Sequence, residues 1–540
     1  MNGAQSLIRT LVDAGVDVCF ANPGTSEMHF VAALDSLKSS SAHELDADAS
    51  NAGEHDADTS GEPEMRAVLA LFEGVVTGAA DGYARIAGKP AATLLHLGPG
   101  LGNGLANLHN ARRAHTPVVN VIGDHATYHK QYDAPLESDI DAVAGSLNGW
   151  VRRSQSPAEV AADAALAVAA AQKAPGQVAT LILPADVSWG DGGEPVKPVP
   201  PRVPQRVTDV RGIAEVLRTG APAALLIGGP ACREPGLLAA SRIAEATGAK
   251  VFIETFPARI ERGAGLPAIE RLGYLAEHVT YQLDGVKHVI VAGTKPPVSF
   301  FAYPGKPSEL VPEGAQVHTL AGLDQDVVAA LKSLADEVAK DKRPAVQPAR
   351  RPALPSGPLT PQNWVEVIGA LLPEGAIISD EANTSGVLLP AATAGAPRHD
   401  VLTLTGGAIG QGLPVAVGAA VAAPDRPVVA LQADGSALYT ISALWTMARE
   451  NLDITTIVLN NRAYAILRME LQRVGAEAAG PKANDLLDLS RPDLDFVKIA
   501  EGMGVPATRA TTAEELAEQF ARALAEPGPH LIDAIVPPLM

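Results

Sequence analysis

The chain is poor in cysteine, in aromatic residues and in long apolar segments. Its two cysteines, Cys19 and Cys232, stand far apart in apolar surroundings and are interpreted as small buried residues in a reducing cytosol. No apolar run approaches the roughly 18 residues that a membrane-spanning helix needs, and residues 1–15 are typical of an amphipathic helix and not of a signal peptide. Basic residues are outnumbered, 42 against 61 acidic ones, so the formal net charge is −19. This balance argues against nucleic acid and anionic membranes as partners, and we expect a cytoplasmic protein.

Two proline-rich stretches, 194–204 and 343–361, interrupt the chain. Neither can form a helix or an inner strand, so both are predicted to be linkers. They leave three parts, residues 1–190, 205–340 and 358–540, and each alternates apolar strands with helical patterns. We therefore predict an α/β protein with three doubly wound parallel-sheet domains.

The segment 39–64 differs from the rest in composition. It contains eight acidic residues, no Lys or Arg and almost no large apolar residue. Such a segment buries too little apolar surface to offset its chain entropy, so we predict a disordered surface loop. Metal binding by its Asp, Glu and His residues is the less favoured alternative.

The most informative stretch is 428–467. One apolar run ends just before Asp434, a helical pattern follows, and a second apolar run, 454–459, ends just before Asn460 and Asn461. A β-α-β crossover brings the carboxyl ends of both strands to one edge of a sheet, so Asp434 and Asn461 are predicted to lie close together. Carboxylate and amide oxygens suit Mg²⁺. The alternative is an ordinary crossover with a polar turn.

Gly435 and Ser436 lead into a helix N-terminus, which favours a diphosphate. The succession of Asp-Gly-Ser, a helix, a strand and Asn-Asn resembles the metal–diphosphate motif of thiamine diphosphate (ThDP) enzymes. In that family a glycine precedes the aspartate, whereas Ala433 stands here. The change is small in volume but would cause strain if the position required a positive φ.

Glu73 stands where an apolar strand, predicted at 66–71, meets the start of a helix. Its setting resembles that of the glutamate that protonates N1′ of the aminopyrimidine in ThDP enzymes. That protonation promotes loss of the proton at C2 of the thiazolium ring, from which the carbanion chemistry of the cofactor starts. The alternative is an acidic residue favoured by the helix macrodipole.

The resemblance covers nearly the whole chain, including the segment 22–25, the turn predicted at 98–100 and both linkers. The order of parts is similar to that of acetolactate synthase and benzoylformate decarboxylase. It implies a pyrimidine-binding domain at 1–190, a Rossmann-like central domain at 205–340 and a diphosphate- and Mg²⁺-binding domain at 358–540. It also implies a homodimer or a dimer of dimers, with the glutamate and the metal site of each active centre coming from different subunits.

The central part gives no sign of a nucleotide. Gly228-Gly229-Pro230 follows an apolar run but is not the glycine fingerprint of a dinucleotide-binding turn, so a structural role is predicted. Acetolactate synthase carries FAD in its central domain, so FAD is allowed by the resemblance, but the sequence gives no positive sign of it.

The resemblance implies roles for individual residues. Gly407 would accept a hydrogen bond from the aminopyrimidine through its carbonyl, and Ile409 would be the bulky residue that bends the cofactor into a V shape. The implied metal ligands are Asp434, Asn461 and the carbonyl of Ala463. The implied cofactor-binding residues are Asn22, Pro23, Glu73, Asn103, Asn383, Thr384, Gly407, Ala408, Ile409, Asp434, Gly435, Ser436, Asn461, Ala463, Tyr464, Ala465 and Ile466.

On the substrate side, His96, His125 and His129 follow predicted strands. Imidazole could orient the carboxylate of a 2-oxo acid or shuttle a proton. His96 corresponds to a catalytic histidine of benzoylformate decarboxylase, and Thr25 replaces a serine of that enzyme, so both are predicted to contact the substrate. His125 and His129 are substrate ligands or, equally, surface or core histidines. The predicted catalytic residues are Glu73 and His96.

The leading prediction is a ThDP- and Mg²⁺-dependent enzyme resembling acetolactate synthase. It would decarboxylate a small 2-oxo acid such as pyruvate and transfer the resulting acyl carbanion to a second carbonyl. One alternative is a non-oxidative 2-oxo acid decarboxylase of the benzoylformate type, although the central-domain histidine of that enzyme has no counterpart at 298–304. The other, from a different class, is a catalytically idle homologue that serves as a binding or regulatory subunit.

Overall fold

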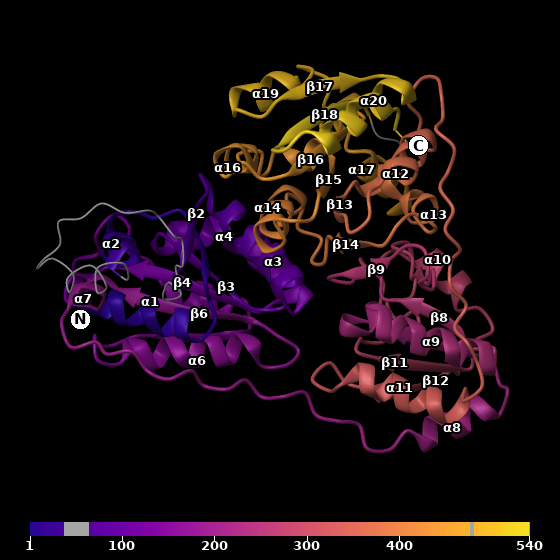
Figure 1. Cartoon of the computed structure of the whole chain (residues 1–540), viewed down its shortest axis with the longest axis horizontal. Helices are drawn as coiled ribbons and strands as arrows, with labels where there is room; N and C mark the ends of the chain where they lie inside the picture. The colour runs from indigo at the N-terminus through magenta and orange to yellow at the C-terminus, as the bar shows by residue number, and fades with distance from the viewer. Residues whose placement is uncertain (37–63, 476–479, 539–540) are drawn as a thin grey trace, which may run out of the picture. The chain divides into compact units, whose positions relative to one another are not determined.

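The computed structural model describes residues 1–36, 64–475 and 480–538. The predicted acidic loop at 39–64 therefore lies almost wholly outside the described residues. The chain divides into two compact units, Met1–Arg202 and Val203–Met540. They contain three sheets, which confirms the prediction of three α/β layers dominated by parallel strands (Figure 1). The second proline-rich stretch lies inside the second unit, and the three domain boundaries stay a prediction.

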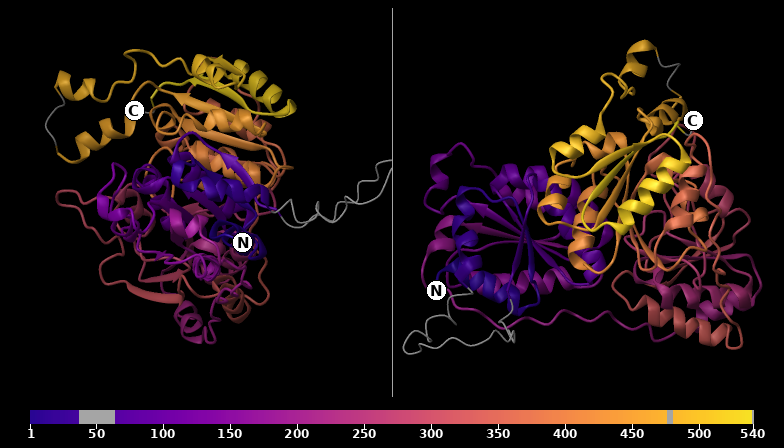
Figure 2. Two further views of the ribbon diagram at one scale, coloured as in Figure 1. Left: turned by 90° about the vertical axis from the view of Figure 1, so that its left-hand side faces the viewer. Right: turned by 45° about the horizontal axis from the view of Figure 1, so that its top comes forward.

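The first unit is built on a parallel sheet with the strand order β2-β1-β3-β4-β6-β5. Helices lie on both of its faces (Figure 2), and α1, α2 and α6 pack on one face over a core that includes Leu7, Phe30 and Leu94. The strands are β1 (Val18–Ala21), β2 (Arg66–Leu69), β3 (Ala91–Leu95), β4 (Val118–Asp124), β5 (Trp150–Arg153) and β6 (Val178–Pro184). The helices are α1 (Gly3–Asp13), η1 (Thr25–Glu27), α2 (Met28–Ser36), α3 (Glu73–Ala87), α4 (Leu97–Ala114), η2 (Lys130–Tyr132), α5 (Ile140–Gly145), α6 (Val160–Gln172) and α7 (Ala185–Trp189).

One local prediction is wrong in this unit. Gly98-Pro99-Gly100 is not a turn but the first turn of α4, closed by the Gly100 amide, which donates to the His96 carbonyl at 2.8 Å. Proline is tolerated there because the first amides of a helix have no intrahelical acceptor. Further along α4, a β-carbon on Gly104 would lie 2.9 Å from Thr77, so glycine lets α4 approach α3 closely.

The second unit contains two sheets. The smaller is parallel, with the order β10-β8-β7-β11-β12, and the larger has the order β17-β18-β16-β15-β13-β14-β9. The strands are β7 (Ala223–Ile227), β8 (Lys250–Ile253), β9 (Ile260–Arg262), β10 (Glu270–Arg271), β11 (His288–Ala292), β12 (Gln316–Ala321), β13 (Ile377–Glu381), β14 (His399–Thr403), β15 (Val428–Ala433), β16 (Ile454–Asn460), β17 (Ala507–Ala510) and β18 (His530–Ile535).

Helices cover both faces of the larger sheet. Trp364 and Phe520, from α12 and α20, are fully buried against one face, and α14 packs on the other. The helices of this unit are α8 (Arg211–Arg218), η3 (Gly229–Cys232), α9 (Glu234–Thr247), α10 (Ala276–Gln282), α11 (Val327–Val338), α12 (Asn363–Leu371), η4 (Asn383–Gly386), α13 (Leu389–Ala392), α14 (Gly412–Ala422), α15 (Asp434–Ala437), α16 (Ala443–Arg449), α17 (Ala465–Arg473), α18 (Pro481–Asp485), α19 (Phe496–Gly502) and α20 (Ala513–Ala525).

The larger sheet departs from the purely parallel prediction at its edge. β9 comes from the chain segment of the smaller sheet and pairs antiparallel with β14, with Ile260 opposite Val401. Arg259, next to it, donates to the Asp400 carboxylate at 2.6 Å. A three-residue strand has too short an apolar pattern to be detected in the sequence, so this link between the two sheets was not predicted.

The helix predicted after Asp434 is also interrupted. The structure has a short α15, an irregular segment and then α16. Thr440, in the irregular segment, donates its hydroxyl to the Gly410 carbonyl at 2.9 Å. This hydrogen bond links the irregular segment to the loop that contains Gly410. A threonine hydroxyl can compete with the hydrogen bonds of a helix, which agrees with the interruption of the helix at this point.

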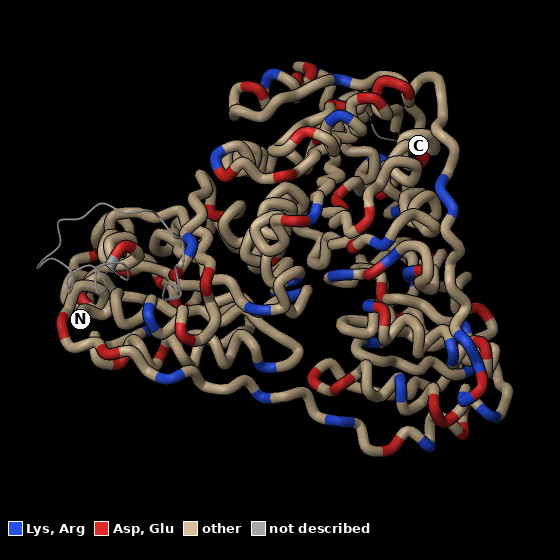
Figure 3. Tube along the Cα trace, viewed as in Figure 1, with Lys and Arg blue, Asp and Glu red and all other residues tan. Residues whose placement is uncertain are grey.

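Acidic and basic residues are interspersed along the trace of both units (Figure 3). Among the described residues, no helix combines the length and the apolarity that crossing a membrane requires.

Candidate active site

The structure places Asp434 and Asn461 at the same edge of the larger sheet. β15 and β16 are parallel neighbours, with Ala433 opposite Leu459. The Asp434 carboxylate accepts hydrogen bonds from the backbone amides of Gly435 at 2.8 Å and Arg462 at 2.6 Å. Arg462 adopts a positive φ of 58°, which turns its amide back toward Asp434. The crossover thus joins the two ends of the motif through the backbone.

Asp434 is a buried carboxylate without a cationic partner. Its exposed fraction is 2 %, and within the described ranges no Lys or Arg side chain pairs with it. Burial raises the pKa of Asp434 to about 6, although the surrounding backbone amides oppose that shift. A cation bound to this carboxylate would compensate for its lost hydration, and the neighbouring Asn461 amide oxygen is a hard donor of the same kind. The donor set therefore fits Mg²⁺.

Ala433 does not occupy a strained position. Its backbone has φ −72° and ψ 145°, an extended conformation that any residue adopts. The concern that a positive φ would require glycine here is therefore wrong, and alanine can precede the acidic turn without strain.

The residues expected to hold the diphosphate lie around this turn. Asn383 and Thr384 are in η4, which contacts both β15 and α17. Gly435 is in α15, and Tyr464 is the N-cap of α17. A β-carbon on Gly435 would lie 2.5 Å from the Tyr464 ring, so only glycine lets this ring approach the turn. The other expected residues, Ser436, Ala463, Ala465 and Ile466, lie in the same two segments.

A glycine-rich loop, 404–411, follows β14 and carries Gly407, Ala408 and Ile409. Gly407 has a φ of 74°. The end of this loop is fixed by Glu381, the last residue of β13, which the sequence did not single out. Its carboxylate accepts from the amides of Gly410, at 2.7 Å, and Gly412, and burial raises its pKa. Glu381 therefore positions the loop.

In the first unit, Glu73 is the first residue of α3 and only 7 % exposed. Asn103 of α4 donates its side-chain amide to Glu73 Oε2 at 3.0 Å. A β-carbon on Gly100 would lie 3.3 Å from Glu73 Oε1, so α4 approaches the carboxylate closely. The structure thus brings together the predicted Glu73 and Asn103.

His96 has a partner that the sequence did not single out. Its Nδ1 lies 2.8 Å from Glu27 Oε2, and Glu27 is 1 % exposed. The same carboxylate oxygen accepts the Gly24 amide at 2.7 Å. A β-carbon on Gly123 would overlap with Glu27, so glycine at the end of β4 makes room for it. In the sequence, Glu27 shows only its position three residues after Gly24, at the start of a helical turn. That spacing is as typical of a helix cap as of a catalytic partner.

Other substrate-side residues are less closely grouped. Thr25 is exposed, and Asn22, before Pro23, donates its backbone amide to Leu94 at 3.2 Å. His129 is exposed and its ring centroid lies 5.3 Å from that of His125. The sequence correctly indicated that these residues lie near the ends of strands. It did not show which of them are exposed on the surface and which could contact a substrate.

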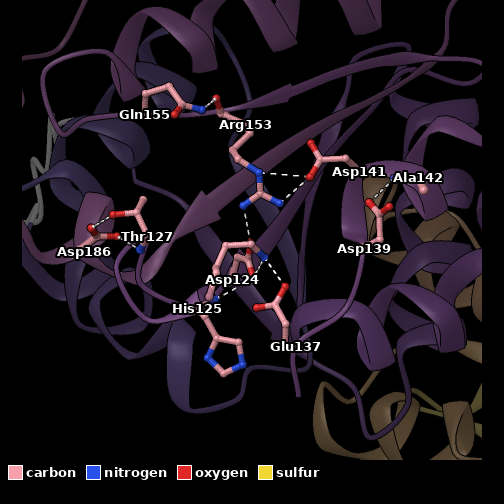
Figure 4. Close-up of polar contacts among 11 residues, drawn as sticks. Asp124, His125, Thr127, Glu137, Asp139, Asp141, Ala142, Arg153, Gln155 and Asp186 are labelled. Carbon is pink, nitrogen blue, oxygen red and sulfur yellow. Dashed lines mark hydrogen bonds and ion pairs between the residues drawn. The ribbon is translucent and has the colours of Figure 1, made fainter. Parts of the chain in front are cut away.

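His125 sits on a firmly held loop. Buried Asp124 accepts the His125 amide at 2.7 Å and pairs with Lys130 at 3.1 Å and with Arg153 (Figure 4). Lys130 also pairs with Glu137. In the close-up the His125 ring points away from this network, and its buried Nε2 has no hydrogen-bond partner among the described residues. The network fixes the backbone around His125 and leaves its imidazole free of that network.

A carboxylate from the segment after β8 accepts a hydrogen bond from the glycine turn after β7. Glu254 accepts the Gly229 amide at 3.1 Å and the Thr294 hydroxyl at 2.8 Å. A dinucleotide diphosphate at this turn would face that negative charge, so the geometry does not favour one there.

We predict that Ala433→Gly leaves the affinity for ThDP, measured by calorimetry with Mg²⁺ present, within about threefold. The reason is that the Ala433 backbone is already relaxed. Glycine should instead lower the free energy of unfolding by about 0.5–1 kcal/mol, because it is more flexible in the unfolded chain. A gain in affinity of tenfold or more would show that alanine strains the motif.

Two family models match the chain. "Thiamine pyrophosphate enzyme, C-terminal TPP binding domain" matches residues 384–534, and "Thiamine pyrophosphate enzyme, N-terminal TPP binding domain" matches residues 50–144. Thiamine pyrophosphate is another name for ThDP. The first range contains the Asp434 motif and the second contains Glu73.

Whole-chain relatives agree with these matches. The chain is 64% identical, over 100% of both chains, to the Mycobacterium tuberculosis protein named "Putative acetolactate synthase large subunit IlvX". It is 29% identical to a Pseudomonas aeruginosa benzoylformate decarboxylase, over 87% of this chain and 92% of the relative. Its fold matches the Rhodococcus jostii RHA1 ThDP-dependent 4-hydroxybenzoylformate decarboxylase with a TM-score of 0.83 and 24% identity over 99% of both chains. The chain belongs to the family of thiamine diphosphate-dependent enzymes.

Proposed function

We propose that this protein is a ThDP- and Mg²⁺-dependent enzyme that decarboxylates a 2-oxo acid and transfers the resulting acyl carbanion to a second carbonyl, as an acetolactate synthase does. The observation that carries the proposal is the buried Asp434 carboxylate, which pairs with no cationic side chain among residues 1–36, 64–475 and 480–538 and which accepts the backbone amide of Arg462, next to Asn461. The relative that is 64% identical supports the carboligase reading by its name.

The larger sheet supplies the anchor. Asp434, Asn461 and the carbonyl of Ala463 would bind Mg²⁺, and the residues of η4, α15 and the start of α17 would hold the diphosphate. The carbonyl of Gly407 and the side chain of Ile409 would hold the aminopyrimidine side of ThDP. When bound, ThDP supplies the carbanion that ordinary side chains cannot stabilise.

The first unit supplies the proton transfers. Glu73 would hold the proton that is shared with N1′ of the aminopyrimidine if ThDP binds, and Asn103 orients the Glu73 carboxylate through the hydrogen bond at 3.0 Å. His96, held at Nδ1 by Glu27, presents Nε2 to the substrate and can hold or deliver a proton there. We infer that the anchor and the proton-transfer residues of one active centre come from two copies of the chain, so that a dimer is the smallest active form.

A second candidate function is a simple decarboxylase, in which a proton and not a second carbonyl reaches the carbanion. The Glu27–His96 pair favours it, because a fixed imidazole is a suitable proton donor. With pyruvate as substrate, acetolactate as the main product supports the carboligase, and free acetaldehyde as the main product supports the decarboxylase.

Mg²⁺ together with ThDP should raise the melting temperature of the wild-type protein by several degrees, and EDTA should reverse the gain. Asp434→Asn should abolish this response, because an amide does not replace the charge of the carboxylate. Asp425→Asn, an exposed change in the same unit, is the control and should respond like the wild type. A full response of Asp434→Asn would exclude Asp434 as a metal ligand.

Glu73→Gln should slow exchange of the ThDP C2 proton by about 10²–10⁴-fold, since the proton on N1′ is lost. ThDP affinity should change by less than about fivefold, because the diphosphate anchor lies elsewhere. Exchange is followed by NMR in deuterated buffer, and the exposed Glu159→Gln is the control. Wild-type exchange in Glu73→Gln would remove this residue from the mechanism, and failure of the wild-type protein to bind ThDP would refute the proposed function.

A further inference from the structure

Three buried polar side chains form a chain of hydrogen bonds at the carboxyl edge of the larger sheet. They are Glu381, the last residue of β13, Gln432 of β15 and Ser436 of α15, and each is at most 2 % exposed. Gln432 donates its side-chain amide to Glu381 Oε2 at 3.1 Å and to the Ser436 hydroxyl at 2.7 Å. We call these three residues the polar relay.

The register of the sheet brings the first two members of the polar relay together. β13 and β15 are parallel neighbours in which Glu381 pairs with Gln432, so their side chains leave the sheet side by side. The start of α14 packs directly on this pair. A β-carbon on Gly412 would lie 2.3 Å from Gln432 Oε1 and 2.9 Å from Glu381 Cβ, so glycine is required there. This close packing keeps both polar side chains in place.

The two ends of the polar relay hold different parts of the proposed cofactor site. At one end, Glu381 accepts the amides of Gly410, at 2.7 Å, and Gly412, which close the glycine-rich loop. At the other end, Ser436 lies in the turn proposed for the diphosphate, and its hydroxyl donates to the Ala433 carbonyl at 3.1 Å. Side chains alone therefore connect the aminopyrimidine side of the site with the diphosphate side.

The Ser436 hydroxyl is the member of the relay that an anion at this turn would change. An anionic oxygen is a stronger acceptor than the Ala433 carbonyl and would take the hydroxyl proton. A hydroxyl that donates to an anion is itself a better acceptor, because successive hydrogen bonds polarise one another in a buried setting. The bond from Gln432 would then strengthen. A more firmly held Gln432 would in turn fix Glu381 and the loop amides that it accepts.

From this geometry we propose that Glu381 and Gln432 are positioning residues that couple the two sides of the cofactor site, so that an anion at the diphosphate turn orders the glycine-rich loop. This inference rests on the proposed function and adds to it how the site is assembled. Gln432 is the decisive link, because it contacts both Glu381 and Ser436. The loop would then be ordered before the aminopyrimidine reaches it, which lowers the entropy that binding must overcome.

A second connection joins the same two parts without the polar relay. Thr440, in the irregular segment after α15, donates its hydroxyl to the Gly410 carbonyl at 2.9 Å. A β-carbon on Gly410 would lie 2.6 Å from Tyr439 Cβ, so this segment also packs closely on the loop. This connection runs along the main chain and does not pass through Gln432. A substitution of Gln432 therefore separates the two routes.

Hydrogen–deuterium exchange followed by mass spectrometry tests the coupling in the full-length protein. Inorganic pyrophosphate with Mg²⁺ takes the place of ThDP, so that the probe fills the diphosphate turn and not the aminopyrimidine side. In the wild type, we expect pyrophosphate to slow exchange in the peptide 404–412 by about fivefold and in the peptide 223–232, from the smaller sheet, by less than about twofold.

Gln432→Leu should bind pyrophosphate within about fivefold of the wild type by calorimetry and yet show no slowing in 404–412, because leucine cannot connect Glu381 with Ser436. Without pyrophosphate its loop should exchange within about threefold of the wild type, since Glu381 still accepts the loop amides. Glu381→Gln should instead speed exchange there by about tenfold without any ligand, because one carbonyl oxygen replaces two carboxylate oxygens. Gln362→Leu, at an exposed position before α12, is the matched control and should behave as the wild type.

Slowing of 404–412 in Gln432→Leu equal to that in the wild type would overturn the inference and assign the coupling to the Thr440 contact. Pyrophosphate that protects the turn at 434–437 alone or neither segment in the wild type, or that slows 223–232 equally, would overturn it as well. Gln432→Met replaces Gln432→Leu if the latter does not fold. In each of these cases the proposed function stands, whereas failure of the wild type to bind ThDP would refute the function itself.

Discussion

The proposed metal-binding end of the larger sheet depends on one constraint: the Asp434 carboxylate is buried, and no cationic side chain in the described part of the second unit pairs with it. Backbone amides of Gly435 and Arg462 hold the carboxylate, but amides only partly offset the loss of water, as the raised pKa of Asp434 shows. A divalent cation, as proposed above, would complete the compensation. The same amides lock the ends of β15 and β16 together, so the groups that would bind the metal also fix the start of α17.

Carboxylates that are buried at Glu27 and Glu381 and half-buried at Glu254 recur beside the glycine turns of this chain. Glu381 accepts amides of the Gly407-bearing loop, Glu27 accepts the Gly24 amide, and Glu254 accepts the Gly229 amide. Glycine supplies the conformational freedom and the close approach, and the carboxylate supplies the acceptor that a turn lacks. Of these three carboxylates, Glu27 also contacts an imidazole, that of His96. The carboxylate that accepts the Gly24 amide would therefore also take part in proton transfer through His96.

Much of the fold followed from local patterns. The apolar run 454–459 lies in β16, Ile454–Asn460, because a buried parallel strand needs continuous apolar sequence. The failures have local physical reasons. Gly98-Pro99-Gly100 has the composition of a turn but forms the first turn of α4, where proline costs nothing. β9 is too short to show a period, and it pairs with β14 through contacts distant in sequence.

The sequence by itself determined which groups the proposed site offers: an Asp-Gly-Ser turn and an Asn-Asn turn separated by one crossover, and a glutamate at the junction of a strand and a helix. These features are local in the sequence. Because a β-α-β crossover has a fixed handedness and its strands are parallel, the Asp-Gly-Ser and Asn-Asn turns come to lie side by side. Only the tertiary structure decided that Ala433 is unstrained, that Glu27 contacts His96, and that Gln432 contacts Glu381. Each of these depends on a backbone angle or a contact between segments distant in sequence, which no spacing along the chain encodes.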